Sequence, residues 1–121
     1  MHSEKPGKVL DLSIALAHVD GDSQLLSELA AIFLQDYPHL MEEASHSILQ
    51  DDCPGLERAA HTLKGRLAFF GIPGLRDQVS SLEEMGREQN LAGARQALAG
   101  IEMEMKPVLS EFEALLREQG S

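Results

Sequence analysis

Apolar residues recur every three or four positions along most of this chain, which is the spacing of a helix that buries one face. No stretch alternates apolar and polar residues for long enough to indicate a half-buried strand. Aromatic residues, which strands favour, make up only 4% of the sequence. The pattern therefore predicts an all-α protein.

Turn and capping residues divide the pattern into five predicted helices, over residues 12–18, 22–50, 52–70, 75–88 and 91–118. Pro38 and Pro107 lie inside the second and fifth of these, and we expect a kink or a short break at each because proline removes a backbone donor. Short connections between long amphipathic helices make neighbouring helices antiparallel. The expected fold is an antiparallel four-helix bundle with a short extra N-terminal helix.

The chain of 121 residues has the length of one domain. The helical pattern occupies residues 10–118, whereas residues 1–9 are polar and indicate a disordered leader or a cloning boundary. No apolar run approaches the roughly 20 residues that span a bilayer, so we expect no membrane contact by this domain. Cys53 is the only cysteine, which excludes an intramolecular disulfide and favours a reducing, cytoplasmic location.

The net charge of −10 argues against nucleic acid as a partner, because affinity for phosphate backbones comes from clustered Lys and Arg. The charge is unevenly distributed. Residues 9–57 contain ten acidic residues and no Lys or Arg, whereas residues 58–95 contain six basic residues against four acidic ones. Positive charge is therefore concentrated in residues 58–95. Surface charge also varies along a chain without any functional reason.

The third predicted helix has an apolar stripe and an outward face. At 100° per residue, its apolar side chains fall within about 60° of Leu63 and form the stripe that we expect to be buried. His61 lies about 160° from Leu63, so it is predicted to point to solvent. Gly65 and Ala68 follow on the same outward face, one and two turns further on, and Lys64 lies on its flank.

Gly65 is unusual, because a glycine inside a helix costs about 1 kcal/mol relative to alanine. One interpretation is that another molecule must come close to His61 and that a side chain at position 65 would obstruct it. The other is that the glycine is tolerated and has no consequence.

Glu83 is the residue of the fourth predicted helix that a hairpin centred near Ile72 would place level with His61. It lies on the flank of its helix, from where its side chain could reach across. A carboxylate that accepts the imidazole N–H would fix the tautomer and leave the other ring nitrogen with a free lone pair, as a nucleophilic imidazole requires. The alternative is an ordinary solvated glutamate on the surface.

These residues also carry a family resemblance. The stretch AAHTLKGRLAFFG resembles the signature of histidine-containing phosphotransfer domains, in which His-x-x-Lys-Gly is followed by a further glycine; His61, Lys64, Gly65 and Gly71 match. The upstream run LLSELAAIFLQDYPHLMEEA resembles the long second helix of that family, and SLEEMGRE resembles its fourth, with Glu83 where the family has a polar residue beside the histidine ring. The similarity covers residues 10–117.

The resemblance implies a phosphocarrier rather than an enzyme. His61 would accept a phosphoryl group from an aspartyl phosphate in one receiver domain and pass it to another, in two-component signal transduction. Lys64 would offset the phosphoryl charge, and Gly65 would let the receiver dock. The domain would need no cofactor of its own, because the partner receiver supplies the Mg²⁺.

Two features depart from the family pattern. Arg66 stands where a small residue is usual, and Phe69-Phe70 is bulkier than the usual stretch. We therefore expect Arg66, Ala68 and Phe69 to take part in partner docking and to influence partner choice. We expect a monomer, and the polar leader favours the C-terminal module of a hybrid sensor histidine kinase, including a membrane-anchored one, over a free-standing protein.

Three other functions were considered. A helical protein-interaction bundle without phosphorylation is the main alternative, and it would make the outward histidine and the helix glycine incidental. A di-iron enzyme would need two Glu-x-x-His pairs, whereas Glu43 and His46 form the only one. A self-contained histidine kinase is disfavoured because the chain lacks a Gly-rich nucleotide loop and room for an ATP-binding domain.

Overall fold

The computed structural model describes residues 11–120, and this part of the chain contains five helices and no strand. The helices are α1 (Ser13–His18), α2 (Ser23–Leu49), α3 (Cys53–Phe70), α4 (Pro73–Arg87) and α5 (Leu91–Gly120). The prediction of an all-α protein is confirmed, and each predicted helix boundary lies within about two residues of the observed one. The predicted leader at residues 1–9 lies outside the described residues.

Three of the helices begin at a side chain that satisfies a free backbone N–H group. A side-chain oxygen at the start of α2, α3 and α5 accepts a hydrogen bond from the N–H three residues further on: Asp22 from Leu25, Asp52 from Gly55 and Asn90 from Gly93, at 3.0 to 3.1 Å. These caps are the predicted ones. The end of α3 is also defined, because Gly71 follows it in the left-handed conformation with φ 73°.

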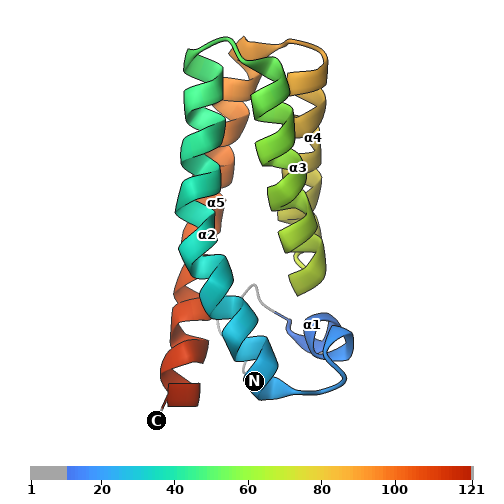
Figure 1. The fold of residues 1–121 in the computed structure, drawn as a ribbon, viewed down its shortest axis with the longest axis vertical. Coiled ribbons are helices and arrows are strands. Elements are labelled where there is room, and N and C mark those ends of the chain that lie inside the picture. Colours follow the sequence, from blue (N-terminus) through green and yellow to red (C-terminus); the bar gives the residue numbers. More distant parts are fainter. Residues whose placement is uncertain (1–10, 121) are drawn as a thin grey trace, which may run out of the picture.

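The two internal prolines do not interrupt their helices. α2 continues through Pro38 and α5 through Pro107, so the short breaks that the sequence allowed do not occur. Figure 1 shows that α2 changes direction along its length, with the part nearer α1 inclined to the rest. A change of direction is the expected response to a proline that removes one hydrogen bond from the helix.

α2, α3, α4 and α5 stand side by side, and α1 lies beyond the end of α3, next to the first part of α2 (Figure 1). α3 contacts α2 and α4, and α5 contacts the same two helices, so the four long helices enclose a common core. Near α1 this core contains three aromatic rings, those of Phe33, Phe70 and Phe112, with centroids 4.8 to 5.6 Å apart. They connect α2, α3 and α5.

α4 approaches α3 closely at Gly86. A Cβ atom at this position would lie 3.1 Å from the backbone nitrogen of Glu57 and 3.3 Å from the carbonyl oxygen of Cys53, both in α3. Real Cβ contacts are rarely so short, so a hydrogen in place of a side chain is what permits this distance between the two backbones. The close approach brings the neighbouring turn of α4, which carries Glu83, toward α3.

Candidate functional site

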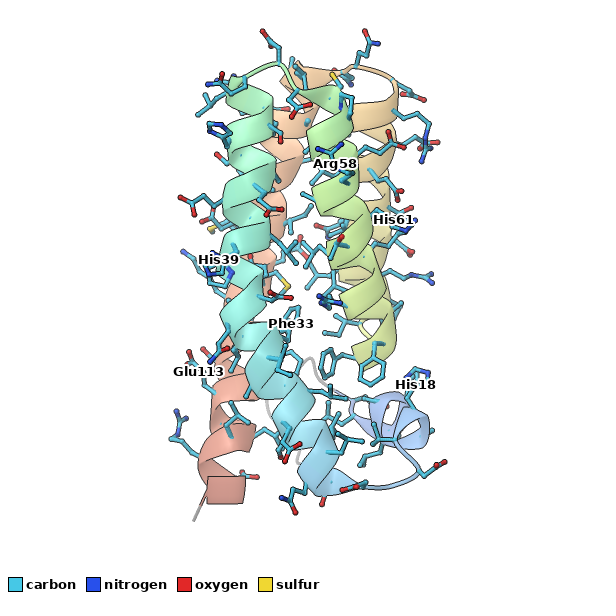
Figure 2. The ribbon with its side chains drawn as sticks, viewed as in Figure 1. His18, Phe33, His39, Arg58, His61 and Glu113 are labelled. Atoms are coloured by element: carbon cyan, nitrogen blue, oxygen red, sulfur yellow. The ribbon has the colours of Figure 1, made fainter. Side chains whose placement is uncertain are left out.

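α3 presents one buried and one exposed face, as the sequence predicts. The six residues of the predicted stripe are all between 0% and 4% exposed: Leu56, Ala59, Ala60, Leu63, Leu67 and Phe70. The side chain of His61, by contrast, is 69% exposed. Figure 2 shows His61 on the outer side of the helices, away from the core. A partner can therefore reach its ring.

Glu83 of α4 holds one nitrogen of that ring, because its Oε2 lies 2.9 Å from Nδ1 of His61. Burial raises the pKa of Glu83, but hydrogen bonds from Lys64 and His61, and their charges, outweigh it, so the pKa lies below its ordinary value. An ionised carboxylate can only accept hydrogen bonds, so Nδ1 carries the proton and donates it. In the neutral ring, Nε2 then has a free lone pair.

Glu83 reaches across from α4 to His61, as the sequence analysis expected. It is only 6% exposed, so the alternative of an ordinary solvated glutamate is wrong. The close approach of α4 to α3 at Gly86, three residues further along α4, accounts for this burial, because it narrows the space around this turn of the helix. A buried carboxylate requires hydrogen-bond partners, and this one has them.

Lys64 and Arg87 complete the surroundings of this carboxylate. Nζ of Lys64 lies 2.6 Å from Oε1 of Glu83, and Nη2 of Arg87 lies 3.6 Å from Oε2. Arg87 also pairs with Glu57 of α3 through a contact of 3.2 Å between Nε and Oε2. The sequence analysis identified Lys64 but missed Arg87 and Glu57; the spacing of four residues between Glu83 and Arg87 was the available signal.

Gly65 and Ala68 lie exposed on the same face of α3 as His61. A Cβ atom added at Gly65 would have no neighbour within 4 Å. Packing within the described part of the chain therefore does not require glycine at this position.

Arg66 and Phe69 have partners within the chain that the sequence analysis did not foresee. Nη2 of Arg66 lies 2.8 Å from Oδ2 of Asp36 in α2, so its side chain bridges two helices at the surface. The ring of Phe69 stacks on His18 of α1 with centroids 4.9 Å apart, and its carbonyl accepts a 3.0 Å hydrogen bond from Nδ1 of His18. Phe69 lies about 80° from His61 around α3, whereas Arg66 lies about 140° from it, on the side that faces α2.

The geometry does not support the di-iron site that Glu43 and His46 would belong to. Glu43 and His46 are both exposed, and within residues 11–120 no three His, Cys, Asp or Glu side chains come together in a way that could hold a metal ion. None of the described helices is long and apolar enough to cross a membrane.

Comparison with known protein families gives a match. The family model described as Hpt domain matches residues 28–118, which extend from α2 to α5 and include every residue of the site around His61. No curated protein and no solved structure matches the chain.

Proposed function

Because the chain belongs to the Hpt domain family, we propose that it is a phosphorelay intermediate that carries a phosphoryl group on Nε2 of His61. Hpt domains take part in histidine phosphotransfer and act as phosphocarriers rather than catalysts. The observation that supports this assignment most directly is the pairing of an exposed imidazole with a buried, ionised glutamate through Nδ1. This pairing leaves the other ring nitrogen available to an incoming phosphorus.

The proposed transfer begins when the lone pair of Nε2 attacks the phosphorus of an aspartyl phosphate in a receiver domain. The N–P bond forms, the bond between phosphorus and the aspartyl oxygen breaks, and the aspartate leaves as a carboxylate. The ring becomes positively charged, and Glu83 stabilises this charge through Nδ1–H. The reverse reaction passes the phosphoryl group to a second receiver. The receivers supply the Mg²⁺ and most of the stabilisation of the transition state.

Five further residues of α3 have proposed roles. Lys64, held close by its contact with Glu83, offsets the negative charge of the phosphoryl group. Gly65 leaves space one turn from His61 for the rim of the receiver. Arg66 and Phe69, together with the exposed Ala68, form part of the docking surface, where their links to α2 and α1 fix their positions.

The wider setting belongs to the same proposal. The arrangement of α2 to α5 is proposed to be an antiparallel four-helix bundle with α1 as the extra helix, supported by short connections and by the contacts among the four helices. We further propose a monomeric, cytoplasmic domain at the C-terminus of a hybrid sensor histidine kinase. The lone cysteine supports a reducing compartment.

Labelling tests the function directly. The protein is incubated with a phosphorylated receiver domain, and the phosphate it acquires is expected to be labile in acid and stable in base. His61→Gln is expected to acquire none and to keep its fold, because the side chain is largely exposed and stability should change by no more than about 1 kcal/mol. His39→Gln, at an exposed histidine of α2, is the matched control. Label on His61→Gln would contradict the assignment, and an unlabelled wild type would favour the interaction bundle.

A further inference from the structure

A hollow of about 390 Å³ lies between α2 and α5, the two long helices that carry neither His61 nor Glu83. Met41 of α2 and Leu98 of α5 provide apolar surface within it. Glu42 and Glu102, one from each helix, line it as well. We call it the α2–α5 groove. Its volume lies within the range of sites that bind small molecules.

Tyr37 places an unpaired hydroxyl at this groove. The residue lines the groove, yet it is only 6% exposed, and its ring packs against Phe33 with centroids 5.9 Å apart. The hydroxyl oxygen is buried and has no hydrogen-bond partner among residues 11–120. Buried polar atoms are nearly always paired, and a phenylalanine would pack the same ring without an unpaired group. The hydroxyl of Tyr37 therefore lacks the hydrogen bond that its burial calls for.

Glu102, which also lines the groove, lies close enough to act on the hydroxyl of Tyr37. Burial raises the pKa of Tyr37 to about 12, and the negative charge of Glu102 adds to the rise. No hydrogen bond joins the two groups. The phenol is neutral at physiological pH and can accept a hydrogen bond from a cation.

The two carboxylates of the groove differ from the others near the α3 site. Asp36, Glu57 and Glu83 each pair with a basic side chain. Glu42 and Glu102 form no ion pair within the described part of the chain. The groove thus combines uncompensated negative charge on both walls with apolar surface from Met41 and Leu98 and a buried, unpaired hydroxyl.

We propose that the α2–α5 groove binds an aliphatic guanidinium, a flat cation on a chain of methylene groups. Its five N–H donors spread in one plane, so one head can contact carboxylates on two walls and the Tyr37 oxygen together. The methylene stem covers Met41 and Leu98, as the stems of arginine side chains do on apolar surfaces. An ammonium group concentrates its charge at one atom and matches two separate walls less well. The ligand is either a free small molecule or an arginine side chain presented by another protein.

The chain contains a single tyrosine and no tryptophan, so its intrinsic fluorescence reports on Tyr37 alone. The full chain is titrated with n-butylguanidinium, and a saturable change in this fluorescence is expected, together with shifts of amide NMR signals confined to α2 and α5. Guanidinium without a stem and 1-butanol without a charge are expected to bind at least about tenfold more weakly. A blocked Gly-Arg-Gly peptide distinguishes the sources: tighter binding of the peptide than of n-butylguanidinium assigns the ligand to a protein, and the reverse order to a small molecule.

Variants complete the test. Glu42→Gln with Glu102→Gln is expected to weaken binding by roughly tenfold or more, because two charge-assisted hydrogen bonds are lost. Tyr37→Phe, followed by NMR, is expected to weaken it several-fold. Glu43→Gln changes the net charge at an exposed position outside the groove and should bind like wild type. Absence of saturable NMR shifts, or equal affinity in wild type and the double variant, would overturn the proposal. Labelling of His61 is measured separately and is independent of either result.

Discussion

Replacement of Glu83 by alanine tests whether its carboxylate controls the ring of His61. The fold should persist, because Lys64 and Arg87, its charged partners, are 31% and 56% exposed and can be hydrated once the carboxylate is gone. We expect a loss of stability of about 1–2 kcal/mol, the usual cost of losing such hydrogen bonds. Any larger effect on phosphorylation must then come from the ring.

The expected effect on the rate has two parts. A hydrogen bond to a charged acceptor contributes about 1.5 kcal/mol or more, which corresponds to a bias of about twelvefold toward the Nδ1–H tautomer. If the tautomers are otherwise equally populated, loss of this bias reduces the reactive fraction from about nine-tenths to one-half, roughly twofold. The bond also strengthens as the ring becomes positive, and loss of a further ~1 kcal/mol slows transfer about fivefold. Together these effects predict a rate about tenfold lower.

The assay uses acetyl phosphate as donor, so that receiver docking does not enter the measured rate. Nitrogen NMR of the histidine ring reports the tautomer in the same samples. Glu84→Ala, at the exposed neighbouring position, is the matched control and should behave like wild type. If Glu83→Ala kept the wild-type ring tautomer and a rate within about twofold of wild type, the hydrogen bond would have no role in the transfer.

Three further predictions concern Gly65, Arg66 and Glu83. Gly65→Gln should stabilise the free domain by up to about 1 kcal/mol and leave labelling by acetyl phosphate unchanged, while transfer from a receiver slows. Equal rates of transfer from a receiver to wild type and variant would contradict the idea that a side chain at position 65 obstructs docking. Arg66→Ser should cost at most about 1 kcal/mol of stability, because its surface pair with Asp36 is lost. It should also change transfer rates with some receivers more than with others, and these differences should shrink as the salt concentration rises. A uniform, salt-independent effect would contradict a role of Arg66 in partner choice. The lowered pKa of Glu83 implies that its contribution to stability is present above the unfolded pKa of about 4.3 and is lost as pH falls through the folded pKa. Glu83→Gln should remove this part of the pH dependence of the free energy of unfolding, measured by chemical denaturation. An unchanged pH profile would show that the fold does not stabilise the carboxylate.

The sequence predicted the helices and their boundaries well because the signals are local. Asp52 followed by Pro54, for example, specifies the start of α3 through one cap and one proline in the first turn. The outward position of His61 follows from the angle between residues within one helix. That His61 and Glu83 lie level along the axes of their helices follows from the single short turn between α3 and α4.

The features that sequence reasoning missed depend on distances between helices. The burial of Glu83 results from how closely α4 approaches α3 at Gly86, and helical periodicity contains no such distance. The pairing of Arg66 with Asp36 joins residues 30 positions apart, and that of His18 with Phe69 joins residues 51 apart. Exposed side chains of this kind have several neighbours within reach, so their partners are decided only when the helices have packed.

The pairing of His61 with Glu83 also has a consequence for folding. The two residues are 22 positions apart and lie on consecutive helices, so their contact closes a short loop at a modest entropic cost. Contacts between α2 and α5 close much longer loops and, on the grounds of contact order, should form later. Opening of α5 during native-state fluctuations would therefore leave the α3–α4 hairpin with its carboxylate and imidazole still adjacent. Hydrogen exchange should show the amides of α3 and α4 opening as one unit, and sequence changes in α5 should alter global stability while the histidine keeps its tautomer.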